Sequence, residues 1–457
     1  MNPEFRRNLW LEMTPRRIAL MTGVLTLAFF AAALSGGDTT APARVAVFLY
    51  YFIVVLWGAR NAGLSVVGEI RDRTWDSQRL SALGAAEMSW GKLFGSTIFN
   101  WYGGAICLAV ILVAHFAHQG PVAALIDLVY FVSIGVIAQS VALLASLIAI
   151  RRRQSHTRFE IFLYQLAGIL AAIVVLYIWS AADPAASFLT AKKTTETVVW
   201  WGRAFDVRPF LLVSLAAFAG WTLLACYREM RLELKMRNRP FVWLGFLAFM
   251  GLYVAGFDAW LAQSANPPSS DSVALRLALA ATTFAVLSYI MVLLEPKDRV
   301  LYRWIGGRVA SGRFLQAASA LQGWMMSYFA AALAIAALIW RLATHTPPDI
   351  AGIAQVGAAL GFLTRDCAIF VLFHTLPGRR RSDFGAVVVL VALYALIPAI
   401  LDGLGLKQAL GFFYPVATDP VWLGAAVAWG QGVLVAALAL GRLAIGEGPE
   451  VKEAVQA

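Results

Sequence analysis

The stretch VAVFLYYFIVVLWGARNAGLSVVG, residues 45–68, is followed directly by EIRDRTWDSQRLSALGAAEMSWGKLF, residues 69–94. The first stretch is a long apolar run, and the second carries many charged residues. About 20 apolar residues are enough to cross a bilayer as a helix, because an α-helix rises ~1.5 Å per residue. A helix also satisfies its own backbone hydrogen bonds in lipid. The pair of stretches therefore predicts a membrane span followed by a polar loop.

The same alternation continues along all 457 residues, of which 60% are hydrophobic and 14% charged. A soluble globular domain carries about 25% charged residues. We therefore predict an all-α polytopic membrane protein with twelve transmembrane helices. The expected spans are residues 18–34, 45–68, 93–115, 122–150, 159–182, 209–226, 241–264, 277–295, 317–340, 350–375, 384–402 and 421–441.

The basic residues predict the orientation of these spans. Most of the 37 Lys and Arg residues fall in segments that lie on the same side as the N-terminus. Under the positive-inside rule both termini are then cytoplasmic, in a multi-pass protein of the cell (inner) membrane whose immediate partner is the lipid bilayer. This bias accounts for the net charge of +11, and no aromatic-basic module suggests a nucleic-acid partner. The three cysteines form no CxxC pair and predict neither a disulfide framework nor a thiolate metal site.

The charged loop after the second expected span recurs after the eighth, as EPKDRVLYRWIGGRVASGRFL, residues 295–315. Glu69, Asp72 and Arg73 recur at one constant offset as Glu295, Asp298 and Arg299, and Gly91-Lys92 recurs as Gly312-Arg313. We therefore predict two six-helix halves, residues 1–239 and 240–457. Because six is even, both halves have the same orientation, which gives a parallel repeat of the kind that transporters use.

Each half also begins with a basic amphipathic segment. Residues 1–17, MNPEFRRNLWLEMTPRR, can form a helix whose apolar side lies in the inner leaflet and whose arginines face headgroups. Residues 228–240, REMRLELKMRNRP, occupy the equivalent place before the seventh span.

The chain contains no G-x-x-x-x-G-K-[ST] loop, the motif that wraps nucleotide phosphates. Gly91-Lys92 is followed by Leu93 and opens a membrane span. The chain is therefore not expected to bind ATP by that route or to hydrolyse it. If the protein is driven by ATP, then ATP and Mg²⁺ bind to a separate subunit.

Residues 69–92 resemble the loop between the second and third spans of permease subunits of type-2 ABC (ATP-binding-cassette) exporters. The matching residues are Glu69, Arg71, Thr74, Trp75, Asp76, Leu80, Leu83, Gly91, Lys92 and Leu93. The sequence departs from the family pattern at Arg73, where glycine is usual, and at Gly84-Ala85, where Thr-Pro is common. The second copy lacks the threonine and its hydrophobic partner.

The resemblance implies a permease subunit of an ATP-driven exporter, without enzymatic activity of its own. In that family this loop is a coupling helix that sits in a groove of a cytoplasmic ABC ATPase, of which two copies are expected. The residues expected to couple are Glu69, Arg71, Arg73, Thr74, Trp75, Asp76, Leu80, Leu83, Glu295, Asp298 and Arg299. Trp75, Leu80 and Leu83 are expected to anchor the loop, since aromatic and apolar anchors carry much interface energy. The alternative is a solvated basic loop without a partner.

Arg365 and Asp366 lie near the middle of the expected span 350–375. A charge there costs at least ~2.5–3.5 kcal/mol, so both side chains should face protein or water. They are candidates for a translocation pathway that contacts an anionic substrate, or for an interhelical ion pair that fixes packing. Adjacent helical residues point about 100° apart, so we expect them to bond different neighbours.

Other polar residues give weaker expectations. Asp127, Asp258 and Asp402 lie near the outer ends of spans, where hydrated capping is expected. His115 and His118 share a helix face, but no third ligand accompanies them, so no metal site is predicted. No set of residues has the context of a catalytic site.

Two other functions remain open at this stage. An ion-driven secondary transporter needs membrane-buried carboxylates, and Asp366 is the one near a span centre. A membrane-embedded enzyme acting on lipid-linked substrates would use Arg365 and Asp366 in its active site. The substrate cannot be inferred from the sequence, and the export direction follows from the resemblance.

Overall fold

The computed structural model describes residues 2–34, 40–151, 158–182, 197–236, 238–264, 271–376, 382–416 and 418–444. Helices make up nearly all regular structure in these ranges, and the two strands found there form one short sheet. The predicted all-α membrane fold is confirmed. The chain divides into two compact units: unit 1 is Met1–Val198 with Ala204–Asn238, and unit 2 is Val199–Arg203 with Arg239–Ala457.

Unit 1 is built around α8, an apolar helix buried on most of its surface. Its elements are α1 (Pro3–Glu12), α2 (Pro15–Leu34), α3 (Ala41–Tyr50), η1 (Tyr51–Trp57), α4 (Gly58–Arg71), α5 (Trp75–Arg79), α6 (Ala85–Trp90), η2 (Gly91–Gly95), α7 (Ile98–Gln119), α8 (Pro121–Arg151), α9 (Arg158–Ala182) and α10 (Val207–Glu233). Helix α8 packs against α4, α9 and α10. A Cβ atom on Gly168 of α9 would stand 2.3 Å from the carbonyl oxygen of Ala138, so α8 and α9 approach through small residues.

Unit 2 contains a second set of long helices and two short ones at the loop end. Its elements are α11 (Phe241–Ala255), α12 (Asp258–Ser264), α13 (Ser272–Leu294), α14 (Arg299–Ala310), α15 (Phe314–Ala318), α16 (Gly323–Ala343), α17 (Ile350–Thr375), α18 (Ser382–Val391), η5 (Ala392–Leu396), α19 (Ile397–Gly403), η6 (Lys407–Phe412) and α20 (Leu423–Ala444). Helices α17 and α20 pack closely because Gly361 has no side chain at their contact. A Cβ atom at this position would lie 2.8 Å from the carbonyl carbon of Ala428. A Cβ on Gly432 would lie 2.8 Å from the carbonyl oxygen of Gly361.

Eleven segments of the described chain are long and apolar enough to cross a membrane. They coincide with eleven of the twelve expected spans. The seventh expected span differs, because α11 ends at Ala255 and a short separate helix, α12, follows. The two-stranded sheet of β1 (Thr197–Trp200) and β2 (Arg203–Asp206) explains this break. Trp200 Nε1 donates to the carbonyl of Tyr253 at 3.0 Å, and the Trp201 amide donates to the carbonyl of Gly256 at 2.8 Å.

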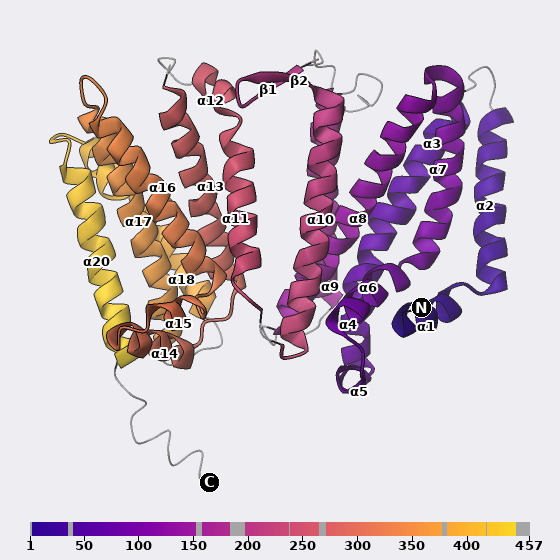
Figure 1. Ribbon diagram of the computed structural model, residues 1–457, viewed down its shortest axis with the longest axis horizontal. Helices are drawn as coiled ribbons and strands as arrows, with labels where there is room; N and C mark the ends of the chain where they lie inside the picture. The colour runs from indigo at the N-terminus through magenta and orange to yellow at the C-terminus, as the bar shows by residue number, and fades with distance from the viewer. Residues whose placement is uncertain are drawn as a thin grey trace, which may run out of the picture. The chain divides into compact units, whose positions relative to one another are not determined.

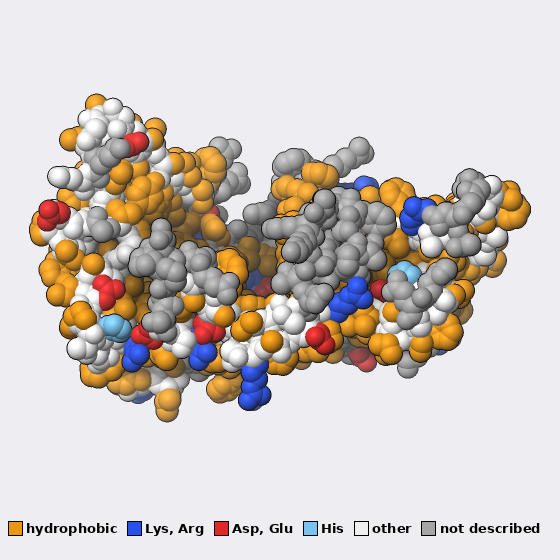
Figure 2. Space-filling model, turned by 90° about the horizontal axis from the view of Figure 1, so that it is seen from above, with side chains coloured by type: hydrophobic (Ala, Val, Ile, Leu, Met, Phe, Trp, Pro, Cys, Tyr) orange, Lys and Arg blue, Asp and Glu red, His pale blue; other side chains and the backbone are white. Residues whose placement is uncertain are grey.

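Within each unit the long helices run roughly side by side, and short helices lie across one end: α1 and α5 in unit 1, α14 and α15 in unit 2 (Figure 1). Figure 2 shows apolar side chains over much of the visible surface, with charged side chains in small groups. Exposed leucines and phenylalanines on long helices, such as Leu27, Phe30 and Leu333, are the surface expected of helices in lipid. The orientation of the spans across the membrane and the parallel repeat stay predictions.

Candidate functional site

The first charged loop folds as two short helices. Helix α4 ends at Arg71, a tight turn follows, and α5 and α6 lead into η2. The turn is closed by the Thr74 amide, which donates to the carbonyl of Glu69 at 2.9 Å. Arg73 in this turn has φ 59°, a left-handed conformation that glycine adopts at lower cost. This geometry explains why glycine suits the same position in the pattern that the loop resembles.

Beneath this loop lies a group of polar and charged side chains that we call the Lys92 cluster, in which Glu4 and Lys92 are buried: Glu4, Arg7, Glu69, Gln78 and Lys92. The side chain of Lys92 is 1% exposed, and its Nζ lies 2.7 Å from Glu4 Oε1. The same Nζ donates to Glu69 and, at 2.8 Å, to Gln78 Oε1. Arg7 pairs with Glu4 at 2.9 Å and also with Glu69. Two carboxylates thus face two cations, which balances the formal charge of the cluster.

Helix α1 reaches this cluster because η2 carries glycines on the contacting side. A Cβ on Gly91 would lie 2.5 Å from Glu4 Cγ, and a Cβ on Gly95 would lie 2.9 Å from Asn8 Nδ2. Asn2 caps α1 by accepting from the Glu4 amide at 3.0 Å. The expected helix within residues 1–17 is therefore present. However, Arg7 pairs with protein carboxylates rather than pointing wholly toward headgroups.

Trp75 was expected to anchor a partner protein, and the structure shows instead that its ring is buried. The side chain is 4% exposed and packs in an apolar cluster with Val66, Val67 and Met88. Its Nε1 donates to Glu233 Oε1 at 3.4 Å, which joins α5 to the end of α10. Trp75 therefore stabilises the loop against its own unit, because an indole beside an apolar helix end gains more by packing there than by facing water.

The exposed part of the loop is its tip. Leu80 is 88% exposed, and Arg71, Arg73, Thr74 and Asp76 are exposed as well. Leu83 is partly buried against the same apolar cluster as Trp75. Of the three expected apolar anchors, Trp75, Leu80 and Leu83, Leu80 is the one whose side chain is largely exposed. We refer to residues 71–74, 76 and 80 as the loop tip.

The second charged loop uses its residues differently. Both oxygens of Glu295 accept from backbone amides at the start of α16, those of Gly323 and Trp324, each at 3.0 Å. Asp298 caps α14 by accepting from the Val300 amide at 2.8 Å, and Arg299 donates to the carbonyl of Thr375. Asp298 and Glu295 therefore fix helix ends within unit 2.

Gly312-Arg313, the recurrence of Gly91-Lys92, lies in the turn between α14 and α15, where Gly312 has φ 71°. It therefore does not occupy the start of a membrane helix as Gly91-Lys92 does. The residues that meet Glu295 at the start of a span are Gly323 and Trp324. The basic segment 228–240 was expected to parallel residues 1–17, but residues 228–233 continue α10 to its end, and the described part of this segment contains no separate helix. Charge spacing alone could not reveal either point, because both depend on where a helix begins or ends.

Near the second loop, Tyr302 of α14 joins neighbouring segments. Its hydroxyl donates to Gln322 Oε1 at 2.9 Å, and Trp324 Nε1 donates to the same oxygen at 2.9 Å. Burial raises the pKa of the Tyr302 hydroxyl well above its ordinary value, and nearby carboxylates, Glu295 first, raise it further. The phenol therefore stays neutral and remains a hydrogen-bond donor through the physiological range.

Arg365 and Asp366 bond different neighbours, as expected from their directions on the helix, and they also bond each other. Arg365 Nε donates to Asp366 Oδ1 at 2.8 Å, and Nη1 donates to Gln431 Oε1 at 2.8 Å. The other carboxylate oxygen of Asp366 accepts from the hydroxyls of Tyr289 and Tyr394, at 2.8 and 2.6 Å. Arg365 is 2% exposed and Asp366 0%. The site is a buried ion pair with further hydrogen bonds to three other elements.

Two outer carboxylates are also paired rather than hydrated caps. Asp127 pairs with His115, and Asp258 pairs with Arg276 at 3.0 Å. Within the ranges that the structure describes, no three His, Cys, Asp or Glu side chains form a group able to hold a metal ion.

The cluster around Lys92 escaped sequence reasoning because Glu4 and Lys92 are far apart in the chain. One signal was present, since Lys92 stands at the start of an apolar segment where a cation needs a partner. Comparisons with protein-family models, with curated proteins and with solved structures find no match to this chain, so its function has to be inferred from its own residues and geometry.

Proposed function

We propose that this chain is the membrane-spanning permease subunit of an ABC exporter and that a cytoplasmic ATPase docks on the loop tip. The observation that supports this most is the Lys92 cluster. An exposed tip is joined through buried charges to helices that enter the membrane. The alternative, a solvated basic loop without a partner, needs only positive charge. It gives no reason for Glu69, Lys92 and the N-terminal helix α1 to meet beneath the loop.

The contacts give this proposal a mechanical basis. Lys92 joins the end of α4 to η2 and α1, since Glu69, Lys92 and Glu4 lie on these three elements. Trp75 and Arg79 join α5 to α10 through Glu233, at 3.4 and 3.8 Å. A force applied at Leu80 therefore reaches α1, α4 and α10 together. ATP and Mg²⁺ bind on the ATPase in this account, and closure of the ATPase moves these helices as a group.

Unit 2 offers a second docking surface on α14 and α15. Phe314 is 65% and Leu315 is 89% exposed there. These side chains lie at the position in unit 2 where Leu80 lies in unit 1, between the carboxylate that follows a span and the start of the next span. The loop tip of unit 1 and this surface of unit 2 would each bind one of the two expected copies of the ATPase.

The test is purification of the full chain from its native cells, followed by measurement of co-purifying ATP hydrolysis. Leu80→Asp should remove most of the associated ATPase activity while the chain itself still folds. Leu404→Asp is the matched control, because Leu404 is also exposed, at 67%, but lies at the end of α19. If ATPase activity co-purifies equally with wild type and Leu80→Asp, or with neither, the docking proposal fails.

A further inference from the structure

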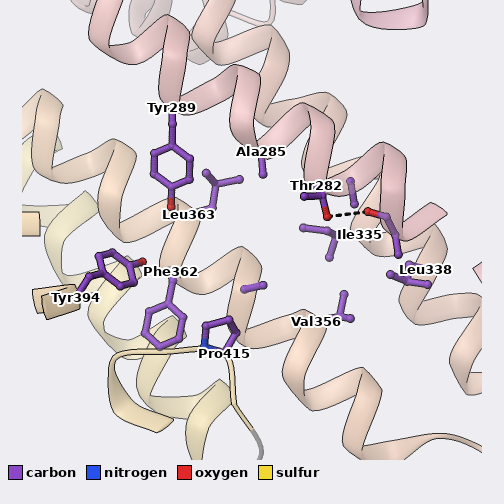
Figure 3. A pocket seen from close by; sticks show the side chains of 13 residues that line it. Thr282, Ala285, Tyr289, Ile335, Leu338, Val356, Phe362, Leu363, Tyr394 and Pro415 are labelled. Atoms are coloured by element: carbon purple, nitrogen blue, oxygen red, sulfur yellow. Dashed lines mark hydrogen bonds between the residues drawn. The ribbon is translucent and has the colours of Figure 1, made fainter. Parts of the chain in front are cut away.

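A cavity of about 330 Å³ lies within unit 2 among residues of α13, α16 and α17 (Figure 3). Its walls are mostly alanine and larger aliphatic or aromatic side chains, including Ile335, Leu338 and Phe362. Its volume falls at the lower end of the range for small-molecule sites, about 300–1,000 Å³. The cavity is therefore large enough for a compact apolar molecule.

One end of this cavity is polar. Tyr289 and Tyr394 line it, and both hydroxyls donate to Asp366 Oδ2, which brings the two oxygens together at this end (Figure 3). A tyrosine hydroxyl that has donated its hydrogen still accepts hydrogen bonds. A ligand donor placed here thus finds two acceptor oxygens.

Arg365 lies behind the same wall. Its guanidinium carbon is 4.8 Å from the ring centre of Phe362 and 5.1 Å from that of Tyr394, and both rings line the cavity. Nε and Nη1 have acceptors, but Nη2 has no hydrogen-bond partner among the described residues. Arg365 itself does not line the cavity, so the rings of Phe362 and Tyr394 stand between its guanidinium and a ligand.

The charges at this end restrict the kind of ligand. Arg365 and Asp366 neutralise each other at 2.8 Å, so the site has no formal charge left for an ionic ligand. An anion or a cation would enter a low-dielectric site without a counter-ion, which is unfavourable. This argues against the interpretation of Arg365 and Asp366 as a contact for an anionic substrate. A hydroxyl group suits the site, because it is neutral and can donate to a tyrosine oxygen.

We propose that this cavity binds a neutral, mainly apolar molecule that carries one hydroxyl group, with the hydroxyl at the Tyr289–Tyr394 end. The proposal does not depend on the permease assignment, because binding is measured without an ATPase. The molecule comes either from the bilayer, as a lipid alcohol, or from solution, as a small apolar alcohol.

The experiment uses the purified full chain in phosphatidylcholine nanodiscs and a diazirine-bearing decanol as photoreactive probe. Labelled peptides should map to α13, α16 and α17. Unlabelled decanol should compete about fivefold better than decane or decanoate, the effect of about one hydrogen bond. Competition by hexanol identifies a dissolved alcohol as the occupant, whereas competition by dioleoylglycerol identifies a lipid.

Two pairs of variants complete the test. Ala285→Phe fills the cavity and should abolish labelling, whereas Ala280→Phe, on the same helix but not lining the cavity, should not. Tyr289→Phe combined with Tyr394→Phe should reduce the preference for decanol over decane about fivefold. Tyr328→Phe, whose hydroxyl bonds Thr364, is the control. The proposal is overturned if decanoate competes as well as decanol, or if a folded Ala285→Phe protein is labelled like wild type.

Discussion

The ammonium group of Lys92 lies 2.7 Å from the carboxylate of Glu4, and the same nitrogen bonds Glu69 at the end of α4. One buried cation thus joins the first helix of the chain, the end of a membrane span and the start of the next. Both Glu4 and Lys92 are almost completely buried, so removing either charge leaves the formal charge of the cluster unbalanced at a buried site.

Lys92→Met should therefore destabilise the protein strongly. It leaves Glu4 and Glu69 with Arg7 as the one remaining cation of the cluster, and breaking a buried pair on one side costs about 3–5 kcal/mol. The measurement is thermal unfolding in detergent by tryptophan fluorescence. Adding Glu4→Gln to Lys92→Met should recover part of the loss. Arg313→Met, at an exposed position, should leave the transition temperature unchanged. Equal transition temperatures for Lys92→Met and Arg313→Met would contradict the cluster.

Gly91→Ala should displace α1 from η2. The new methyl group would lie 2.5 Å from Glu4 Cγ, which is too close for any real contact, and overpacking costs about 1–3 kcal/mol. Limited proteolysis near the N-terminus should then proceed faster. Gly306→Ala on α14 meets nothing within 4 Å and is the matched control. Unchanged proteolysis in Gly91→Ala would show that α1 does not depend on this contact.

Substitutions of Trp75 and Leu80 should have different effects, because Trp75 contributes to stability and Leu80 is proposed to contribute to docking. Trp75→Ala removes a buried indole and should lower the free energy of unfolding by about 3–5 kcal/mol. Leu80→Ala acts at an exposed position and should change it by less than about 0.5 kcal/mol. Chemical unfolding of the two variants measures both values. A large loss for Leu80→Ala would place that side chain in the core rather than at the tip.

Asp366→Asn should destabilise the protein strongly, although the two side chains have nearly the same size and shape. It leaves Arg365 charged and buried without a counter-ion, which costs about 3–5 kcal/mol. Replacing both residues, as Arg365→Met with Asp366→Asn, should be less destabilising than Asp366→Asn alone. Thermal unfolding tests this, with Asp402→Asn at an exposed position as control. If the double variant is the less stable protein, the two charges do not act as a pair.

The spans could be predicted from the sequence because each depends on local apolar length. The end of α11 at Ala255 could not, since it depends on Trp200 and Trp201 bonding carbonyls far along the chain. Likewise, no local pattern distinguishes a tryptophan that packs under a loop, such as Trp75, from one that faces a partner. Glu69 and Lys92 were singled out from the sequence, but their partner Glu4 was not, because it comes from a distant segment and only the fold brings it to them.

The docking of an ATPase on the loop tip is the central claim, and photocrosslinking in living cells tests it most directly. A photoreactive amino acid placed at Leu80 or Leu315 should crosslink a protein that carries the G-x-x-x-x-G-K-[ST] motif and lacks membrane spans. The same group at Leu404 should not crosslink it. Absence of that partner at both Leu80 and Leu315, or equal crosslinking from Leu404, would contradict the account.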